Sequence, residues 1–444
     1  MIQSTQVKRS AAAICLGVSL FAFSKPAFAA APAAARELRG TVAGSGASYV
    51  VRPDASVPTA AIELWFRTPS TGYGTLQPGI ARVALASIAA SQPSGRATTL
   101  AQLVNRVGGQ LTFSVYPDMT SVGASVPAGH AGEILRAMTS AYFTPTLTED
   151  GFKLGVRDTV VAGQVARYEV DHRLHDELFA HMFSGGPAHY APVPYDVADV
   201  NRIAFNDARG FAQRGFRAGN TVISIVGNVD ANVLNDVAHA SGGAAMDAAI
   251  VSQRSSSSQS TSLKADVAGV GIAYAGPPIK DARAATALDF VADYLFHPET
   301  GVVGGKTRVS VDDYLSGQFV TLYDPGVLVV TFSGKNATSL RDNTFDAINS
   351  LRSPLDAKTF ARARAAFAYH ALADVQTPLT MADNLGWYTL QGNGLYAPGD
   401  SSETYAQAIE SLDPSYVAGV VRKYLHDPTV VQLVSAPAST GETI

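Results

Sequence analysis

Few residues of this 444-residue chain have the types and spacing needed to bind a metal or perform catalysis. The densest group is His172, His175 and His181. His172 and His175 would share one face of a helix, where two imidazoles converge on a metal if a third ligand is fixed beside them. The sequence fixes no third ligand, so the group is more typical of a solvated or interface face. Four other histidines are interpreted as loop or surface residues: His130, His189, His297 and His370.

Two other kinds of chemistry lack a complete motif. The segment Gly305-Lys306-Thr307 resembles the end of a phosphate-binding loop, but Thr300 occupies the place of that loop's first glycine. No Gly-x-Ser-x-Gly follows a predicted strand, which excludes the nucleophile elbow of a serine hydrolase. Trp65 and Trp387 fall at strand and helix positions and are interpreted as core residues.

The N-terminus is typical of a secretory signal. Residues 1–29 contain basic Lys8 and Arg9, an apolar stretch from Ala11 to Phe23, and a cleavage site at Ala27-Phe28-Ala29. The apolar stretch is shorter than the roughly 20 residues that span a bilayer. We therefore expect a mature chain with no membrane anchor, secreted and most consistent with a bacterial periplasm.

Composition narrows the class further. With 47% apolar and 16% charged residues, the chain is typical of packed globular domains. The single cysteine, Cys15, lies in the signal, so disulfides and cysteine-bound metals are excluded from the mature chain. Loss of Lys8, Arg9 and Lys25 lowers the formal net charge from -4 to -7. A mildly acidic chain without a basic cluster is not typical of nucleic-acid binding.

The elements that would position functional residues occur twice. Matching segments are separated by a constant 208 residues: Ala61 to Pro69 and Gly269 to Pro277, Gly109 to Leu111 and Gly317 to Phe319, Pro117 and Pro325, Phe152 and Phe360, Thr221 to Val226 and Thr429 to Val434. One offset held over most of a domain length indicates an internal duplication.

Each half has the same predicted order: a strand, an apolar helix, a strand pair, several helices and a last strand. This order predicts an α+β fold of two homologous domains, each a mainly antiparallel sheet with helices packed on one face. We expect an N-terminal lead-in over 30–45, a first domain over 46–251 and a second over 265–440. Residues 252–264 are predicted to form a flexible Ser-rich linker.

Several segments, in this order, resemble the insulinase/pitrilysin family of zinc peptidases. The resemblance is to its short two-domain branch of processing-peptidase subunits and bacterial paired proteins, and it spans nearly the whole mature chain. The segments that carry it are Gly79-Ile80-Ala81, Val107-Gly108-Gly109, Pro117 to Thr120, and Phe216 to Asn220 leading into Val226 to Asp230.

The resemblance implies a zinc site that has been lost. In the family, Gly-(Ile/Leu)-Ala is followed by His-x-x-Glu-His, which supplies two zinc ligands and the general base. Arg82, Ala86 and Leu85 stand at these positions, and counting onward to the family's third ligand, a glutamate, reaches Gln164. Arginine donates no lone pair, and leucine and alanine have no ligand atom. We therefore expect no catalytic residue, no metal and no cofactor in this chain.

The resemblance also implies where peptides would bind. Family members bind an extended peptide along a strand edge, which in this chain corresponds to Gly109, Leu111, Thr112, Phe113 and Ser114. Residues 111–115 alternate between apolar and polar types, as a half-buried strand does. The family's second domain contributes an arginine and a tyrosine to the substrate, and Asn384 and Tyr388 stand nearest to their places.

Two functions fit these features. The first is a catalytically silent subunit that forms a heterodimer with an active zinc-peptidase homologue and encloses peptides with it, so that zinc is expected only in the partner. The alternative is a stand-alone peptide-binding or scaffold protein of the cell envelope without protease activity. A neighbouring gene that encodes an intact His-x-x-Glu-His would favour the first.

Overall fold

The computed structural model describes residues 37–43, 45–68, 70, 77–92, 97–183, 197–229, 232–238, 258–306, 313–391 and 401–435. The predicted signal, residues 1–29, and the first part of the Ser-rich segment lie outside the described residues. No helix in the described ranges is long and apolar enough to cross a membrane.

The first half is built on a six-stranded sheet in the order β1-β2-β6-β3-β5-β4. Its strands are β1 (Leu38–Thr41), β2 (Ser48–Pro53), β3 (Thr59–Phe66), β4 (Gln110–Val115), β5 (Thr120–Pro127) and β6 (Thr221–Gly227). Its helices are α1 (Ile80–Ala90), α2 (Leu100–Arg106), α3 (Ala131–Phe143), α4 (Glu149–Ala166), α5 (Val170–Met182), α6 (Val197–Asn201), α7 (Phe205–Gly215) and α8 (Val233–Ala238). Two 3-10 turns, η1 (Ala128–His130) and η2 (Ala218–Asn220), complete it.

The second half is built on a five-stranded sheet in the order β7-β11-β8-β10-β9. Its strands are β7 (Gln259–Ala265), β8 (Gly269–Ala275), β9 (Tyr314–Val320), β10 (Val327–Ser333) and β11 (Thr429–Ser435). Its helices are α9 (Ala282–Phe296), α10 (Val302–Lys306), α11 (Ala337–Ser350), α12 (Ala357–Ala373), α13 (Pro378–Leu390), α14 (Ser401–Glu410) and α15 (Pro414–Tyr424).

The two halves confirm the predicted duplication and fold class. Both sheets are mainly antiparallel, with one parallel pair in each, β2 with β6 and β7 with β11. The offset of 208 residues relates the first residues of α4 and α12, of α5 and α13, and of β6 and β11. The predicted match of Gly109 with Gly317 is wrong, because Gly109 precedes β4 whereas Gly317 lies within β9. The turn between β9 and β10, residues 321–326, is longer than that between β4 and β5, residues 116–119, which breaks the offset there.

The second half begins earlier than the sequence suggested. Residues 259–265, most of which were assigned to the Ser-rich linker, form β7 and pair in parallel with β11. Side chains of β7 alternate between half-buried and exposed, because it is an edge strand with one solvated face. Leu263 and Ala265 pack against the interior. Ser260 and Ser262 lie on this solvated face.

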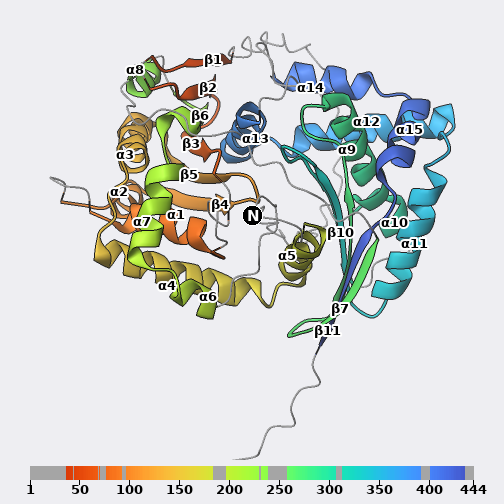
Figure 1. Ribbon diagram of the computed structural model, residues 1–444. Helices are drawn as coiled ribbons and strands as arrows, with labels where there is room; N and C mark the ends of the chain where they lie inside the picture. The colour runs from red at the N-terminus through yellow and green to blue at the C-terminus, as the bar shows by residue number, and fades with distance from the viewer. Residues whose placement is uncertain are drawn as a thin grey trace, which may run out of the picture.

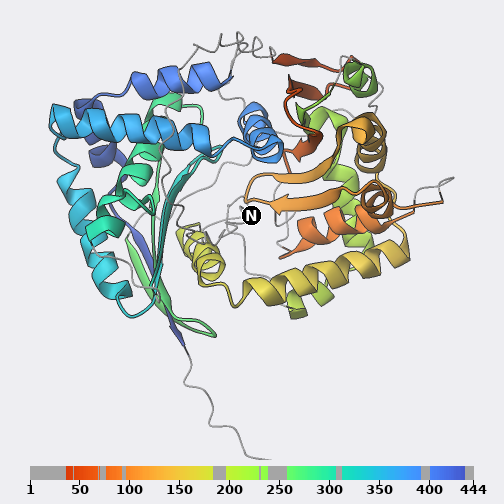
Figure 2. The same ribbon diagram turned by 180° about the vertical axis from the view of Figure 1, so that it is seen from behind.

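Each sheet is covered on both faces, and one helix on each inner face comes from the other half (Figure 1, and from behind in Figure 2). The outer face of the first sheet packs on α1, α3 and α7, and that of the second on α9, α11, α12 and α15. On the inner faces, α13 lies across β3 and β6 of the first sheet, and α5 lies across β8 and β11 of the second. The sequence predicted helices on one face and did not predict this exchange.

The exchanged helices close a third core between the halves, referred to below as the shared core. Alternation along β3 directs Ile62 and Leu64 to the outer core and Ala61 and Trp65 to the shared core. Trp65 meets Trp387 of α13 edge to face, with ring centroids 5.6 Å apart. The close approach depends on glycine: a Cβ on Gly386 would lie 2.9 Å from Cγ of Trp65 and nearer still to other ring atoms.

We expect Gly386→Ala to destabilise the protein by about 1–3 kcal/mol, because the added methyl overpacks a fully buried indole. Gly419→Ala on α15 is the matched control, since its Cβ would meet only Arg422 Nη2 at 3.9 Å. Replacing that helical glycine should raise stability by up to about 1 kcal/mol. Chemical denaturation of both variants checks this, and equal effects would mean that the exchanged helix is not tightly seated.

Candidate functional site

The helices implied to carry the family's zinc ligands, α1 and α4, lie side by side and antiparallel. Gly79, with φ 85° at the N-cap of α1, turns the chain into the helix in a conformation that glycine adopts without strain. Further along, Gly155 and Gly151 of α4 face Ser87 and Ser91 of α1. A Cβ on either glycine would lie within 3 Å of the serine backbone, at 2.9 and 2.8 Å from the two serine Cα atoms.

Arg82 occupies the space between α1, α4 and β4. Its Nη2 and Nε lie 3.0 and 3.2 Å from Oδ2 of Asp158 on α4, and its Nη1 donates to the carbonyl oxygen of Phe113 on β4 at 3.2 Å. Its Cζ also lies 5.3 Å from the centre of the Phe113 ring. A fixed cation thus stands at the position that the sequence resemblance predicted for a first zinc-ligating histidine, held by a carboxylate, a carbonyl and an aromatic face.

The other two motif positions are part of the core. Leu85 is fully buried, and its backbone carbonyl accepts a hydrogen bond of 2.9 Å from the hydroxyl of Tyr142. Ala86 is 5% exposed. Neither side chain can bind a metal or take a proton from water.

The counted third-ligand position does not face Arg82. Gln164 is exposed near the end of α4, six residues or about 9 Å of helix beyond Asp158. Asp158 is the acidic residue that contacts Arg82, and counting along the sequence missed it. The sequence carries no local signal for this contact, because Asp158 meets Arg82 only through the antiparallel packing of α1 against α4.

The predicted peptide-binding segment forms an edge strand. In the described part of the chain, β4 has a strand neighbour only on its β5 side. The Tyr116 N–H donates to the Met119 carbonyl, so in the register of this hairpin the backbone polar groups of Leu111, Phe113 and Val115 point to the open edge. Arg82 already occupies the carbonyl of Phe113.

Side chains of β4 alternate as predicted. Leu111 and Phe113 pack against the outer core, whereas the Thr112 hydroxyl shares the space above Gly123 with the Glu63 carboxylate on the other face. Ser114 lies two residues after Thr112 in β4 and so shares its face of the sheet. Only glycine fits at position 109 without a shift of its neighbours, because a Cβ there would lie 2.8 Å from the Ser125 carbonyl oxygen.

The candidates on α13 lie elsewhere. Tyr388 is buried in the shared core, where burial raises the pKa of its phenol and its hydroxyl hydrogen-bonds to Thr321. Its side chain therefore packs in the interior instead of reaching a peptide on β4. Asn384 is half-buried on the same helix.

The histidines of α5 are engaged separately. His172 lies 3.1 Å from Glu169, and His181 lies 3.8 Å from Glu177. His175 stacks on Phe179 with centroids 4.6 Å apart, and burial lowers its pKa to about 4. Of the other predicted surface histidines, His130 is exposed beside Glu133, and His189 lies outside the described residues.

A pair of neighbouring acids, one buried and one half-buried, was not predicted. Glu63 of β3 is 3% exposed, and its Oε2 accepts a hydrogen bond of 2.6 Å from Nε1 of Trp65. Burial, together with the neighbouring carboxyl of Asp383 on α13, raises the pKa of Glu63 well above its usual range. Burial raises the pKa of Asp383 to about 6. The available signal was one glutamate in an otherwise apolar strand.

The arrangement of two duplicated sheets, joined by exchanged helices, defines a known fold. A protease from Helicobacter pylori superposes with a TM-score of 0.76 and 16% identity over 90% of this chain and 100% of that one. An inactive domain of peptidase M16 from Pseudomonas fluorescens superposes with a TM-score of 0.74 and 16% identity, over 91% of this chain and 100% of that one. A putative M16-like peptidase from Alicyclobacillus acidocaldarius superposes with a TM-score of 0.73 and 14% identity, over 90% of this chain and 98% of that one.

The chain therefore has the M16, or insulinase/pitrilysin-like, peptidase fold over nearly the full length of these structures, as the sequence motifs implied. No protein-family model matches the sequence, and no curated protein does.

The acid pair predicts a pH dependence. Because both folded-state pKa values are raised, the folded protein holds more protons than the unfolded chain above about pH 4, and its stability falls as the pH rises through about 6. Glu63→Gln keeps an acceptor for Trp65 and removes one charge. We expect this variant to gain stability over the wild type between pH 5 and pH 8, on the order of 1 kcal/mol per unit of pKa shift removed.

Denaturation at several pH values measures that gain. Glu133→Gln is the control, because Glu133 forms only exposed ion pairs. A pH profile for Glu63→Gln that runs parallel to the wild type would contradict the assignment.

Arg82→Ala should lower the free energy of unfolding by about 1–2 kcal/mol, because it removes charge-assisted hydrogen bonds that tie α1 to α4 and β4. Arg106→Ala is the matched control. Arg106 makes a 3.7 Å ion pair with Glu133 between exposed side chains, so its loss should cost less than about 0.5 kcal/mol. Similar losses in the two variants would show that Arg82 does not join these elements.

Proposed function

We propose that this protein is a non-catalytic homologue of the M16 peptidases that associates with an active homologue and binds peptides without cleaving them. One observation carries the proposal: the Arg82 guanidinium, bound to Asp158 and to the Phe113 carbonyl, fills the place of a zinc ligand. The fold neighbours, which include an inactive M16 domain, are consistent with it.

The local chemistry supports the loss of catalysis. Metallopeptidases activate a metal-bound water and pass its proton to a general base. The Arg82 guanidinium has only donors and offers no lone pair to a metal, and buried Leu85 stands at the predicted place of the base. Catalytic zinc is therefore expected only in the partner, and no residue of the first half is assigned a catalytic role.

Peptide binding is proposed at the edge of β4. An extended peptide would pair with the backbone groups of Leu111 and Val115, which point away from β5. Thr112 and Ser114 would face one side of that peptide's path, with Leu111 and Phe113 on the other. Arg82 holds the intervening Phe113 carbonyl, so the peptide must either bond around it or displace the guanidinium.

An apolar stripe on α4 supports association with another chain. Leu154, Val161 and Val165 follow the seven- and four-residue spacing of one face of α4, and Tyr168 lies in the turn just after the helix; each is more than half exposed. Contiguous exposed apolar side chains on a soluble protein mark interaction surfaces. We assign this stripe to the homologous peptidase subunit and place the heterodimer in the bacterial periplasm, with the signal removed.

The test uses the mature chain, the active homologue and an equimolar mixture. Alone, the mature chain should cleave no fluorogenic peptide, with or without added zinc, because it lacks ligands and base on α1. In the mixture, size-exclusion chromatography at micromolar concentration should give a heterodimer. Cleavage by the isolated chain that a chelator abolishes would overturn the non-catalytic assignment.

Val161→Asp tests the surface. A charge in the centre of the stripe should weaken association at least tenfold without lowering the chain's own thermal stability. Tyr369→Asp on α12 is the matched control, since residue 369 lies 208 positions after 161 and is also exposed. If the chains elute separately while the isolated chain still binds peptide, the stand-alone peptide-binding function replaces the subunit proposal.

A further inference from the structure

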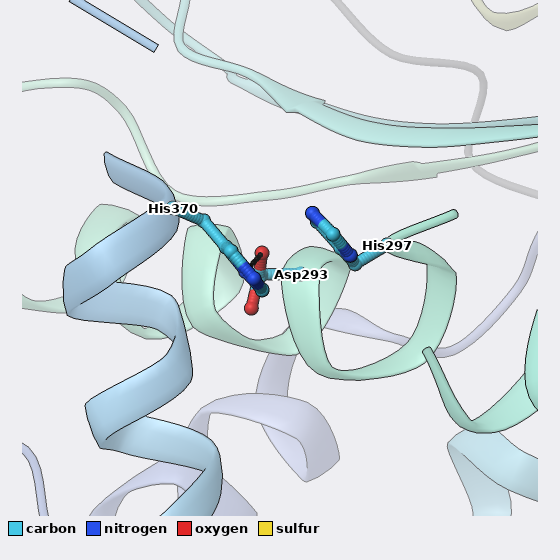
Figure 3. Close-up of side chains that lie close together, drawn as sticks. All are labelled: Asp293, His297 and His370. Carbon is cyan, nitrogen blue, oxygen red and sulfur yellow. Dashed lines mark hydrogen bonds and ion pairs between the residues drawn. The ribbon is translucent and has the colours of Figure 1, made fainter. Parts of the chain in front are cut away.

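The second half contains a cluster of metal-ligating side chains that the proposed function does not use. Asp293 and His297 lie one helical turn apart at the end of α9, and His370 approaches them from α12 (Figure 3). His370 Nδ1 is 2.7 Å from Asp293 Oδ1, and the rings of His297 and His370 stack with centroids 3.6 Å apart. One ligand atom from each residue lies within 4.8 Å of the others.

The crossing of α9 and α12 fixes this cluster. Phe290 of α9 packs against Phe360 and Phe367 of α12, with centroids 5.2 and 6.0 Å apart. His297 is the C-cap residue of α9, and its Nδ1 lies 3.1 Å from the hydroxyl of Thr300, which steadies the ring. The side chains of Asp293 and His370 are each 14% exposed, so they are ordered by packing yet open to a small ion.

The geometry fits one ion. The centre of a triangle with sides of 4.8 Å lies about 2.8 Å from each corner. Zinc binds histidine nitrogen and carboxylate oxygen at about 2.0–2.2 Å. Shifts below about 1 Å per side chain are therefore sufficient, which is within ordinary rotamer adjustment.

Carboxylates act on the cluster as well. Burial and the neighbouring His370 lower the pKa of His297, which favours the neutral imidazole that a metal binds, while Asp293, Glu299 and Asp374 attract positive charge to it. Asp374 follows His370 by one helical turn, as His297 follows Asp293, and adds a negative charge on the α12 side. Nitrogen and carboxylate donors of this kind suit zinc and other late transition metals better than magnesium or calcium.

We propose that Asp293, His297 and His370 form a zinc-binding site that joins α9 to α12. Zinc binding at His370 Nδ1 displaces the proton between that nitrogen and Asp293 Oδ1: an imidazolium releases it to solvent, whereas a neutral ring loses it at Nδ1 and takes one up at Nε2, so the ligand is a neutral imidazole in both cases. The site differs from the family's zinc position, which is in the first half and near the start of α1, where Arg82 is the third helical residue. Its role is to fix two helices, and it assigns no catalysis to this chain.

The metal-stripped mature chain, titrated with zinc chloride in a calorimeter and then analysed for bound metal, tests the site. We expect one zinc per chain and a rise in melting temperature on zinc addition. His297→Ala and His370→Gln should each weaken binding by more than the roughly tenfold that loss of an outer-shell partner costs. Their circular dichroism spectra without metal should match the wild type, which separates loss of the site from loss of the fold.

His172→Ala is the control, because His172 is a half-exposed histidine of α5, outside the α9 and α12 pair, and it forms an ion pair with Glu169 at the start of its own helix. It should keep wild-type zinc affinity, and so should Arg82→Ala, which makes the result independent of the proposed function. Absence of saturable zinc binding by the wild type would overturn the site. Binding that survives both ligand variants, or that His172→Ala also loses, would overturn it as well.

Discussion

The exchange of α5 and α13 between the halves is the constraint on which the rest of the structure depends. Each sheet would otherwise expose an inner apolar face, with Trp65 on one side and Ala273 and Val329 on the other. Covering each face with a helix from the opposite half buries both faces in one core. Neither half can then keep its inner face covered alone, so the two must fold as one unit although each has its own sheet and outer core.

This exchange also determines how the candidate residues are used. Because α13 is needed as a lid on the first sheet, its Gly386, Trp387 and Tyr388 face the interior and pack there. The same packing places Asp383 next to Glu63, and burial raises the pKa values of both carboxyls. The residues of α13 that pack in the shared core thus hold the two halves together.

Much of the fold was predictable from sequence, because it depends on local patterns that occur twice. The offset between Thr221 and Thr429 and the alternation in β4 identified the duplicated α+β halves and the edge strand. The sequence could not show which half a helix covers, since α5 and α13 have apolar faces that fit either sheet. Serine-rich β7 was mistaken for a linker because a solvated edge strand and a flexible connector share that composition.

The site was less predictable, because its contacts join distant residues. Replacement of the motif positions by Arg82, Leu85 and Ala86 was visible, but the partner of Arg82 was not. Asp158 lies 76 residues away and meets Arg82 only through the crossing of two helices. His297 and His370 likewise come together from helices 73 residues apart, so each appeared isolated in the sequence.

Duplication explains how the two halves came to differ at corresponding places. At the end of α1, the C-cap residue and the residue one turn before it are Ser91 and Ser87, small enough for α4 to approach through Gly151 and Gly155. At the end of α9 the same two positions hold His297 and Asp293. There α12 brings His370 to the cluster, at a position that the 208-residue offset relates to Ala162 of α4 and not to Gly151 or Gly155. The same helix pair thus joins by backbone proximity in one half and by a polar cluster in the other.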